Sequence, residues 1–534
     1  MQLHLTYSKS LLKIISITLL VFFTACKSDT NKTISTDTTD FRFEEITITK
    51  LQEGYNNNKF TITEVTQSFI NQIEKIDDNG PQLNSVIQVN PDAITIAEQL
   101  DKELQEGKSR GALHGIPVLL KDNIDTHDNM FTTAGSRALQ DSKPLQDSHV
   151  AKSLREAGAV ILGKANLSEW ANFRGEMSSS GWSGIGGQTK NPYILDRNPC
   201  GSSSGSGVAV SANLTVLAIG TETNGSIVCP SNNNGVVGIK PTVGLVSRSG
   251  IIPISFTQDT AGPMARTVAD AVICLGTLTG VDPDDSKTLA SKNNIKNDYT
   301  EFLNKDGLEG KKIGIYTAPL GRNYKVDTIF NKAVDFIKSQ GAEVVEIDRI
   351  SDNNVGGLSF QVMLYEYKDG LNNYFKSLGK DAKIKNLEDL IAFNKKDSIE
   401  MEFYNQRYLE MALEKEGLDS DGYKETVSKM LEGARKKGID KVMDEHNLDA
   451  IISPTGGPAW KTDHINGDSF GLGSSSPAAR AGYPNITVPM GFVDTLPVGI
   501  SFFGRAWSEP ILIEIAYAYE QGTKHRKAPE FLKN

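Results

Sequence analysis

The sequence contains few of the residues from which metal and cofactor sites are built. Only four of its 534 residues are cysteines, and Cys200, Cys229 and Cys274, which follow Cys26, show no CxxC spacing. A zinc site or a disulfide framework needs such spacings or a larger, even set of cysteines. The seven histidines are scattered, and His114 lies in the apolar run GALHGIP, which is typical of a hydrogen-bonded core residue. The sequence therefore predicts neither a metal ion nor a cofactor.

Basic tracts are also absent. Lysine and arginine together number 56 against 66 aspartates and glutamates, a formal net charge of −10, and no aromatic stripe is interleaved with basic residues. Because an acidic chain repels phosphate backbones, no nucleic acid is expected as a partner. With 38% hydrophobic and 23% charged residues, the composition is that of an ordinary soluble enzyme.

The most informative segment covers residues 198–230, NPCGSSSGSGVAVSANLTVLAIGTETNGSIVCP. It places Ser202 and Ser226 in Gly/Ser-rich turns on either side of an apolar stretch. Glycines allow positive φ and leave backbone N–H groups free to point at a developing oxyanion, which is typical of a serine hydrolase. A lone Gly/Ser run is more often a flexible loop. Neither serine is the central serine of a G-x-S-x-G elbow, which argues against an α/β-hydrolase, and few histidines are available for a His-based triad.

A lysine near the end of an apolar run is the second unusual feature. The run GALHGIPVLLKDN, residues 111–123, indicates a buried strand that ends near Lys121. Burial beside hydroxyl groups lowers the pKa of a lysine, so that its neutral amine can act as a base. The alternative is a lysine at a strand end whose amine reaches water.

With this lysine and both serine turns in view, the chain resembles the amidase signature family. The resemblance runs from about residue 63 to residue 516 through the blocks GALHGIPVLLKDNID, GAVILGKANLSEW, CGSSSGSGVAVSAN, AIGTETNGSIVCPSNNNGVVGIKPTVGLVSRSGIIPISFTQDTAGPMART, DAIISPTGGPA, AGYPNITVPMG and LPVGISFFGRA. It implies an α/β fold: one large domain at about 44–530, with a mixed, twisted β-sheet covered by helices on both faces.

The resemblance also implies a Ser-Ser-Lys triad. Ser226 matches the family nucleophile, Ser202 matches the serine held by a cis peptide bond, and Lys121 matches the base. The matching oxyanion donors are the backbone N–H groups of Thr223, Asn224, Gly225 and Ser226. The implied reaction is hydrolysis of a carboxamide to a carboxylate and ammonia through an acyl-enzyme on Ser226. Ser203, Ser204 and Ser206 are interpreted as turn formers.

Three positions depart from the common family pattern G-T-D-x-G-G-S-I-R. Glu222 replaces the aspartate, Asn224 the first glycine and Val228 the arginine, so the acid-to-arginine pair of many members is absent. The strings TETNGSIVCP and SSSGWSGIGGQTKNPY are similar to the bacterial peptide-amidase-like branch, which implies carboxy-terminal peptide amides as substrates. The resemblance leaves two alternatives: the glutamine-hydrolysing A-type subunit of a tRNA-dependent amidotransferase, and a non-catalytic lipoprotein that binds ligands on an amidase scaffold.

The amino terminus indicates export. Lys9 and Lys13 precede an apolar run at 14–23, and FTAC at 23–26 resembles a bacterial lipobox. We expect a lipoprotein signal peptide at 1–25, a lipid on Cys26 and a flexible, polar tether at 26–43, which would anchor the protein to a bacterial membrane, in the periplasm or at the cell surface. The alternatives are a short membrane anchor and an ordinary secretory signal. In such an oxidising compartment a disulfide between Cys200 and Cys229 is compatible with their positions, and it stays open here.

The remaining patterns are coarser. Short apolar runs at 116–120, 159–162, 216–219, 312–316, 450–453 and 485–488 predict strands, and a helix capped by Thr63 is expected early in the chain. The family motifs fade at about 282–447, where a variable helical region is expected to shape the substrate funnel. Within it, Tyr365, Tyr367, Tyr374 and Phe375 are either pocket residues or core. Arg480 is a candidate partner for a substrate carboxylate, or a surface arginine.

Overall fold

The structure is a computed structural model that describes residues 41–352 and 354–534. The expected signal peptide, Cys26 and the tether up to residue 40 lie outside the described residues. The described part forms one compact unit that begins at Phe41. Phe43, which the sequence assigns to the tether, is buried and its ring stacks on that of Phe69, so the folded unit starts before the expected residue 44.

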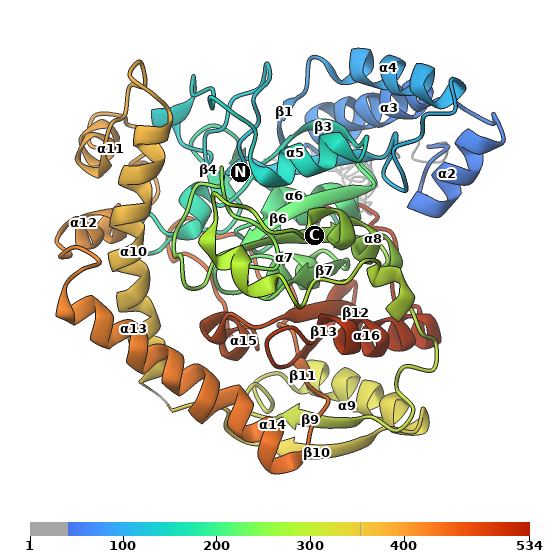
Figure 1. Ribbon diagram of the computed structural model, residues 1–534, viewed down its shortest axis with the longest axis vertical. Helices are drawn as coiled ribbons and strands as arrows, with labels where there is room; N and C mark the ends of the chain where they lie inside the picture. The colour runs from blue at the N-terminus through green and yellow to red at the C-terminus, as the bar shows by residue number, and fades with distance from the viewer. Residues whose placement is uncertain (1–40, 353) are drawn as a thin grey trace, which may run out of the picture. The chain divides into compact units, whose positions relative to one another are not determined.

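A mixed sheet of 11 strands forms the centre of the fold (Figure 1). The strands lie in the order β1 (Val86–Val89), β3 (Val160–Ala165), β2 (Pro117–Lys121), β6 (Leu217–Glu222), β8 (Thr260–Ala265), β7 (Val237–Lys240), β12 (Asn485–Val493), β13 (Leu496–Phe503), β11 (Ala450–Pro454), β9 (Lys312–Tyr316) and β10 (Glu343–Ile347). Neighbours β3, β2 and β6 are parallel, as are β11, β9 and β10, and the pairs between them are antiparallel. A separate hairpin joins β4 (Trp182–Ser183) to β5 (Gly187–Gln188).

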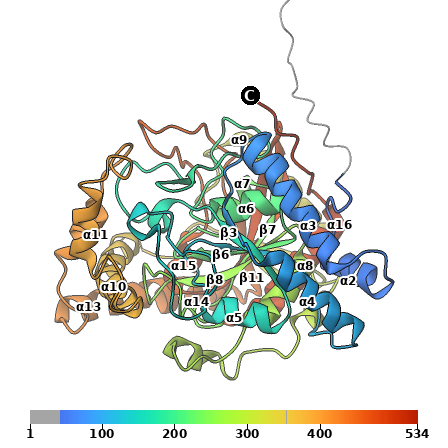
Figure 2. The ribbon, with the colours of Figure 1, turned by 90° about the horizontal axis from the view of Figure 1, so that it is seen from above.

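Helices cover both faces of this sheet. They are α2 (Ile48–Asn56), α3 (Ile62–Gln72), α4 (Ala93–Gln105), α5 (His149–Glu156), α6 (Ser204–Ser211), α7 (Val228–Asn233), α8 (Val268–Leu278), α9 (Tyr324–Ser339), α10 (Val355–Ser377), α11 (Leu387–Asn394), α12 (Arg407–Leu413), α13 (Asp421–Ala434), α14 (Asp440–His446), α15 (Ser476–Ala481) and α16 (Glu509–Thr523). Helices α6 and α7 contact each other and the sheet. Helices α8 and α16 contact each other, and they pack on β7 and β8 and on β12 and β13, respectively. Helices α10, α11 and α13 lie together at one side of the sheet in both views (Figures 1 and 2).

The six predicted strands correspond to β2, β3, β6, β9, β11 and β12. The cap of the early helix is different from the expected one: α3 begins after Thr61, whose hydroxyl accepts from Glu64 N while the Glu64 carboxylate accepts from Thr61 N. The Thr63 hydroxyl donates instead to Asp101 at 2.6 Å. The expected helical region at 282–447 also supplies β10, which extends the sheet beside β9. Strand β10 has exposed positions and the sequence EVVEI, so it lacks the apolar run from which the other strands were predicted.

A buried ion cluster fixes this variable region to the loops above the sheet. Arg174 Nη1 lies 2.9 Å from Glu169 Oε1 and 3.0 Å from Glu400 Oε2, and the three side chains are fully buried. The Arg174 guanidinium also lies 3.9 Å from the centre of the Tyr404 ring. Glu400 in turn accepts from Arg137 N at 2.6 Å. Because one buried charge cannot be removed without leaving the others unpaired, the cluster ties segments that are far apart in sequence.

None of the helices in the described part of the chain has the length and apolarity that a membrane crossing requires.

Candidate active site

Two parallel strands bring the predicted base to the centre of the site. Strands β2 and β6 are neighbours, with Leu120 opposite Ile219, so both end at the same edge of the sheet. Lys121 is the last residue of β2, and Thr221 lies at the end of β6. The run PVLLK is buried throughout, which is why its lysine enters the interior and does not reach water.

Among the described residues, the Lys121 amine hydrogen-bonds only to neutral oxygen atoms. Its Nζ lies 2.7 Å from Ser202 Oγ, 2.8 Å from Thr221 Oγ1 and 3.3 Å from the Thr221 carbonyl oxygen. Burial lowers the pKa of Lys121 to about 7, while the charges of Asp259 and Glu222 act in the opposite direction. A substantial fraction of the amine is therefore neutral at neutral pH, as a general base requires.

The two serine turns lie side by side. Ser203 N donates to the Ser226 carbonyl oxygen at 3.1 Å, so the residue after Ser202 touches the backbone of Ser226. The peptide bond between Gly201 and Ser202 is cis. Ser202 is fully buried and Ser226 is half-buried, so of the two predicted catalytic serines Ser226 is the one with exposed surface.

A disulfide joins the same two turns. Cys200, two residues before Ser202, is bonded to Cys229, three residues after Ser226. The sequence left this pairing open, and the structure makes it. Cys274 is free and buried.

The turn at residues 223–226 has the backbone shape expected for oxyanion donors. Gly225 has φ +86°, which favours glycine. The Asn224 side chain accepts from Ser475 Oγ at 2.8 Å, which holds the turn from outside. None of the four backbone N–H groups from Thr223 to Ser226 donates a hydrogen bond to another of the described residues. Glu222, in place of the usual aspartate, accepts from Ile227 N and Val228 N, so its carboxylate pairs with backbone where the family pattern has an arginine.

Two of the other three hydroxyls of the first turn have structural partners, and that of Ser204 has none among the described residues. Ser203 Oγ donates to the Thr221 carbonyl oxygen and accepts from Thr221 N. Ser206 Oγ donates to the Ile219 carbonyl oxygen. Ser204 lies in the first turn of α6 and is buried. None of these three contacts Lys121 among the described residues.

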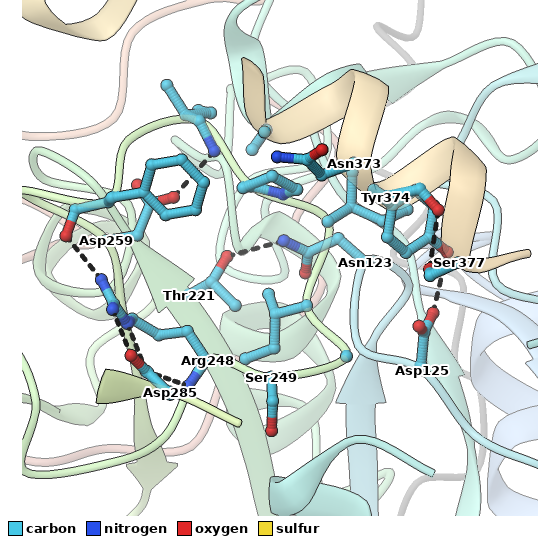
Figure 3. Close-up of a pocket in the computed structure, with 18 of the residues that line it drawn as sticks. Asn123, Asp125, Thr221, Arg248, Ser249, Asp259, Asp285, Asn373, Tyr374 and Ser377 are labelled. Atoms are coloured by element: carbon cyan, nitrogen blue, oxygen red, sulfur yellow. Dashed lines mark hydrogen bonds and ion pairs between the residues drawn. The ribbon is translucent and has the colours of Figure 1, made fainter. Parts of the chain in front are cut away.

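A cavity of about 560 Å³ opens beside the strand ends (Figure 3). One wall comes from the loop after β2 and the end of β6, and the opposite wall from α10. Apolar side chains predominate, among them Leu145, Ile251, Ile252, Ile254, Phe256 and Leu378, and its charged groups are Arg248 and the carboxylates Asp125, Glu222, Asp259, Asp284 and Asp285. Arg248 is paired with Asp285 at 2.6 Å. The cavity therefore suits a ligand that is apolar or cationic beyond its reacting group.

The aromatic residues of α10 divide between cavity and core. Tyr374 lines the cavity, and its hydroxyl donates to Asp125 Oδ1 at 2.9 Å. Tyr367 and Phe375 belong to a buried cluster with α11 and α12, while Tyr365 packs against Tyr423 outside it. Arg480 lies half-buried on α15 and does not line the cavity. His114 is a buried core residue whose Nε2 lies 3.0 Å from the Leu100 carbonyl oxygen.

Sequence reasoning missed Asn123, Thr221 and Asp259, all of which line the cavity. Asn123 and Thr221 sit in the quoted motifs beside the predicted triad, so their proximity was the available signal. Asp259 had no such signal, since only the fold brings it near Lys121. No group of three or more potential metal ligands occurs within residues 41–352 and 354–534.

Known proteins match this chain over most of its length. Residues 64–513 match the family model described as Amidase. The structure of the native peptide amidase from Stenotrophomonas maltophilia is similar with a TM-score of 0.89 and 48% identity, covering 92% of this chain and 99% of that one. A probable amidase from Arabidopsis thaliana is 41% identical over 92% of this chain and 93% of its own length. A glutamyl-tRNA(Gln) amidotransferase subunit from Thermoanaerobacter pseudethanolicus is 31% identical, covering 91% of this chain and 98% of its own length.

Lys121 generates a prediction about pH. We expect kcat/KM for an uncharged amide to rise with pH through about 7, because only the deprotonated amine accepts a proton from Ser202. Asp259→Asn should move this rising limb to lower pH. The negative charge of Asp259 raises the pKa of Lys121, so its removal lowers that pKa. Burial raises the pKa of Asp259 to about 6, so that it is ionised at the limb.

The matched control is Asp284→Asn, which removes another carboxylate that lines the cavity but is not among the charges that act on Lys121. It should leave the position of the limb unchanged. A wild-type limb above about pH 9 would show that Lys121 is protonated near neutrality and contradict its role as base.

The disulfide generates a second prediction. Replacing Cys200 and Cys229 together by serine should lower the free energy of unfolding by about 3 kcal/mol, because the bond closes a loop across 29 residues of sequence separation. It should also lower kcat more than it changes KM, since the bond fixes the turn of Ser202 to the helix after Ser226. Denaturant titration and steady-state kinetics measure the two effects.

Cys274→Ala is the control for the loss of a buried cysteine outside the site. A folded double variant with full kcat would show that the bond does not position the turns.

Proposed function

Because this chain belongs to the amidase signature family, we propose that it hydrolyses the carboxy-terminal carboxamide of peptides, or of similar amides, through an acyl-enzyme on Ser226. Family membership makes it a hydrolase of amide bonds. The peptide substrate and the roles of the individual residues are the proposal. The observation that carries it is the buried Lys121 amine at 2.7 Å from Ser202 Oγ, in a turn that touches Ser226.

The proposed reaction moves one proton along this chain of groups. The Ser226 hydroxyl attacks the amide carbonyl carbon and gives its proton to Ser202, whose own proton passes to neutral Lys121. The carbonyl oxygen becomes negative and is stabilised by the backbone N–H groups of residues 223–226, a type of contact worth about 3 kcal/mol per donor. The relay then returns the proton to the nitrogen, the C–N bond breaks and ammonia leaves. Water attacks the ester on Ser226 and releases the carboxylate.

A peptide amide is supported by similarity and by space. Among the known proteins compared above, the one with 48% identity is a peptide amidase. A cavity of about 560 Å³ is also larger than a simple aliphatic amide needs, and its apolar lining suits the side chain of the last residue of a peptide. The glutamine-hydrolysing alternative has support from a relative of lower identity, 31%, and its small polar substrate fits this lining less well.

Ammonia release tests the proposal. Amidated peptides with an apolar last residue should be hydrolysed faster than simple amides and free glutamine, because they fill the cavity. Ser226→Ala should reduce release by at least about a thousandfold. Ser206→Ala is the matched control and should keep activity, because the Ser206 hydroxyl donates to the Ile219 carbonyl oxygen within the fold.

Glutamine as the preferred substrate would favour the amidotransferase alternative. Folded protein that hydrolyses no amide in the panel would favour the non-catalytic scaffold.

We propose further that the protein is exported and anchored by a lipid on Cys26 to a bacterial membrane. The lipobox-like FTAC supports this, and so does the disulfide of Cys200 with Cys229, since disulfides persist in oxidising compartments. In cells fed labelled palmitate, the wild-type protein should carry the label and sediment with membranes, whereas Cys26→Ser should lose both properties. Cys274→Ala is the control. Label that persists in Cys26→Ser would contradict the proposal.

A further inference from the structure

Asn123 lies two residues after Lys121, and its side-chain amide is held at the wall of the cavity. Asn123 Nδ2 donates to Thr221 Oγ1 at 3.1 Å, the same hydroxyl that lies 2.8 Å from Lys121 Nζ. Figure 3 shows this bond among the residues that line the cavity. Because the nitrogen is held by Thr221, the orientation of the amide is fixed and its oxygen points away from that hydroxyl.

The oxygen of this amide has no partner. Asn123 is 2% exposed, and no donor among the described residues bonds its Oδ1. Buried carbonyl oxygens nearly always accept a hydrogen bond, because water cannot satisfy them. The cavity is the side from which a ligand can supply the missing donor, and amide N–H groups are the donors that a peptide amide carries closest to its reacting carbonyl.

We propose that Asn123 Oδ1 accepts a hydrogen bond from an amide N–H of the substrate. This inference rests on the proposed function and names what selects the substrate: an N–H group next to the scissile bond. Two N–H groups have this chemistry, that of the departing carboxamide and that of the backbone of the last residue. Asn123 thereby favours amides over analogues that lack the N–H.

A purely structural role would have another signature. If Asn123 only held Thr221 and through it Lys121, its loss would slow every substrate by the same factor and shift the pH limb. A direct contact instead slows only the substrates that carry the donor. The ratio of kcat/KM between two substrates separates the two roles, and it does not depend on the fraction of folded enzyme.

The experiment uses the wild-type protein and Asn123→Leu, which is close in size and lacks the acceptor. Three matched substrates are compared: a peptide amide, the same peptide as its methyl ester, and the peptide amide with a methylated nitrogen in its last residue. The ester lacks the departing N–H, and the methylated peptide lacks the backbone N–H. Thermal unfolding of both proteins reports the cost to stability.

We expect Asn123→Leu to lower kcat/KM for the peptide amide by roughly tenfold to a hundredfold. If the departing carboxamide is the donor, hydrolysis of the ester is spared. If the backbone N–H is the donor, hydrolysis of the methylated peptide is spared. Either pattern supports the inference and identifies the source.

Two variants serve as comparisons. Thr221→Ser keeps the hydroxyl that contacts Asn123 Nδ2 and Lys121 Nζ, and should leave the substrate ratios unchanged. Asn394→Leu replaces another fully buried asparagine whose side-chain amide has no partner among the described residues, outside the cavity, and should leave the substrate ratios unchanged.

An equal loss on all three substrates, or no loss on any, would overturn the inference while leaving the amidase proposal intact. Folded wild-type protein that hydrolyses none of them would overturn the proposed function, and the inference with it.

Discussion

The site depends on the burial of one amine that bonds no carboxylate within the described part of the chain. There Lys121 Nζ bonds only hydroxyl and carbonyl oxygens, and burial lowers its pKa to about 7. A carboxylate in direct contact would favour the charged form and remove the base. Asp259 and Glu222 are near enough to raise the pKa, but each is bonded to backbone N–H groups. These bonds stabilise the two negative charges without bringing them to the amine, which leaves the lysine close to the pH at which a base works best.

The neighbouring strand shows what a different surrounding does to the same residue type. Lys164 on β3 lies opposite Leu120 and is also fully buried, and burial lowers its pKa too. Its amine bonds the Ile124 carbonyl oxygen and Thr132 Oγ1, while the charges of Asp122 and Asp125 oppose the lowering. Asp122 accepts from Gly135 N and Asp125 from Tyr374, so this lysine lies within the network that shapes the loops. Burial alone therefore does not identify a base, and the proposed role of Lys121 rests also on its contact with Ser202.

The sequence predicts the candidate catalytic residues better than the residues that form the walls of the cavity. The segments that contain Lys121, Ser202 and Ser226 stand out by their local pattern of buried run and glycine turn, and the family resemblance assigns the three residues within them. Strands β2 and β6 are parallel neighbours, so their ends bring Lys121 beside Thr221. Tyr374 contacts Asp125 across 249 positions of sequence, and no local pattern encodes that contact. The predicted cap of α3 was wrong for a similar reason. The hydroxyl of Thr63 donates to Asp101 on α4, a contact across 38 positions of the sequence.

This difference has a consequence for how the protein selects substrates. The strand-end wall, with Asn123 and Thr221, is fixed by ladder hydrogen bonds and by the Lys121 contacts. The opposite wall is α10, which lies in the region where the motifs fade and is joined to the rest through Tyr374 and through Glu366, which accepts from Thr257 N at 3.1 Å. The proposed chemistry lies at the strand ends, whereas α10 forms the wall of the cavity that the proposal assigns to the side chain of the substrate. Reactivity toward the amide bond and choice of side chain would then be carried by separate parts of one chain.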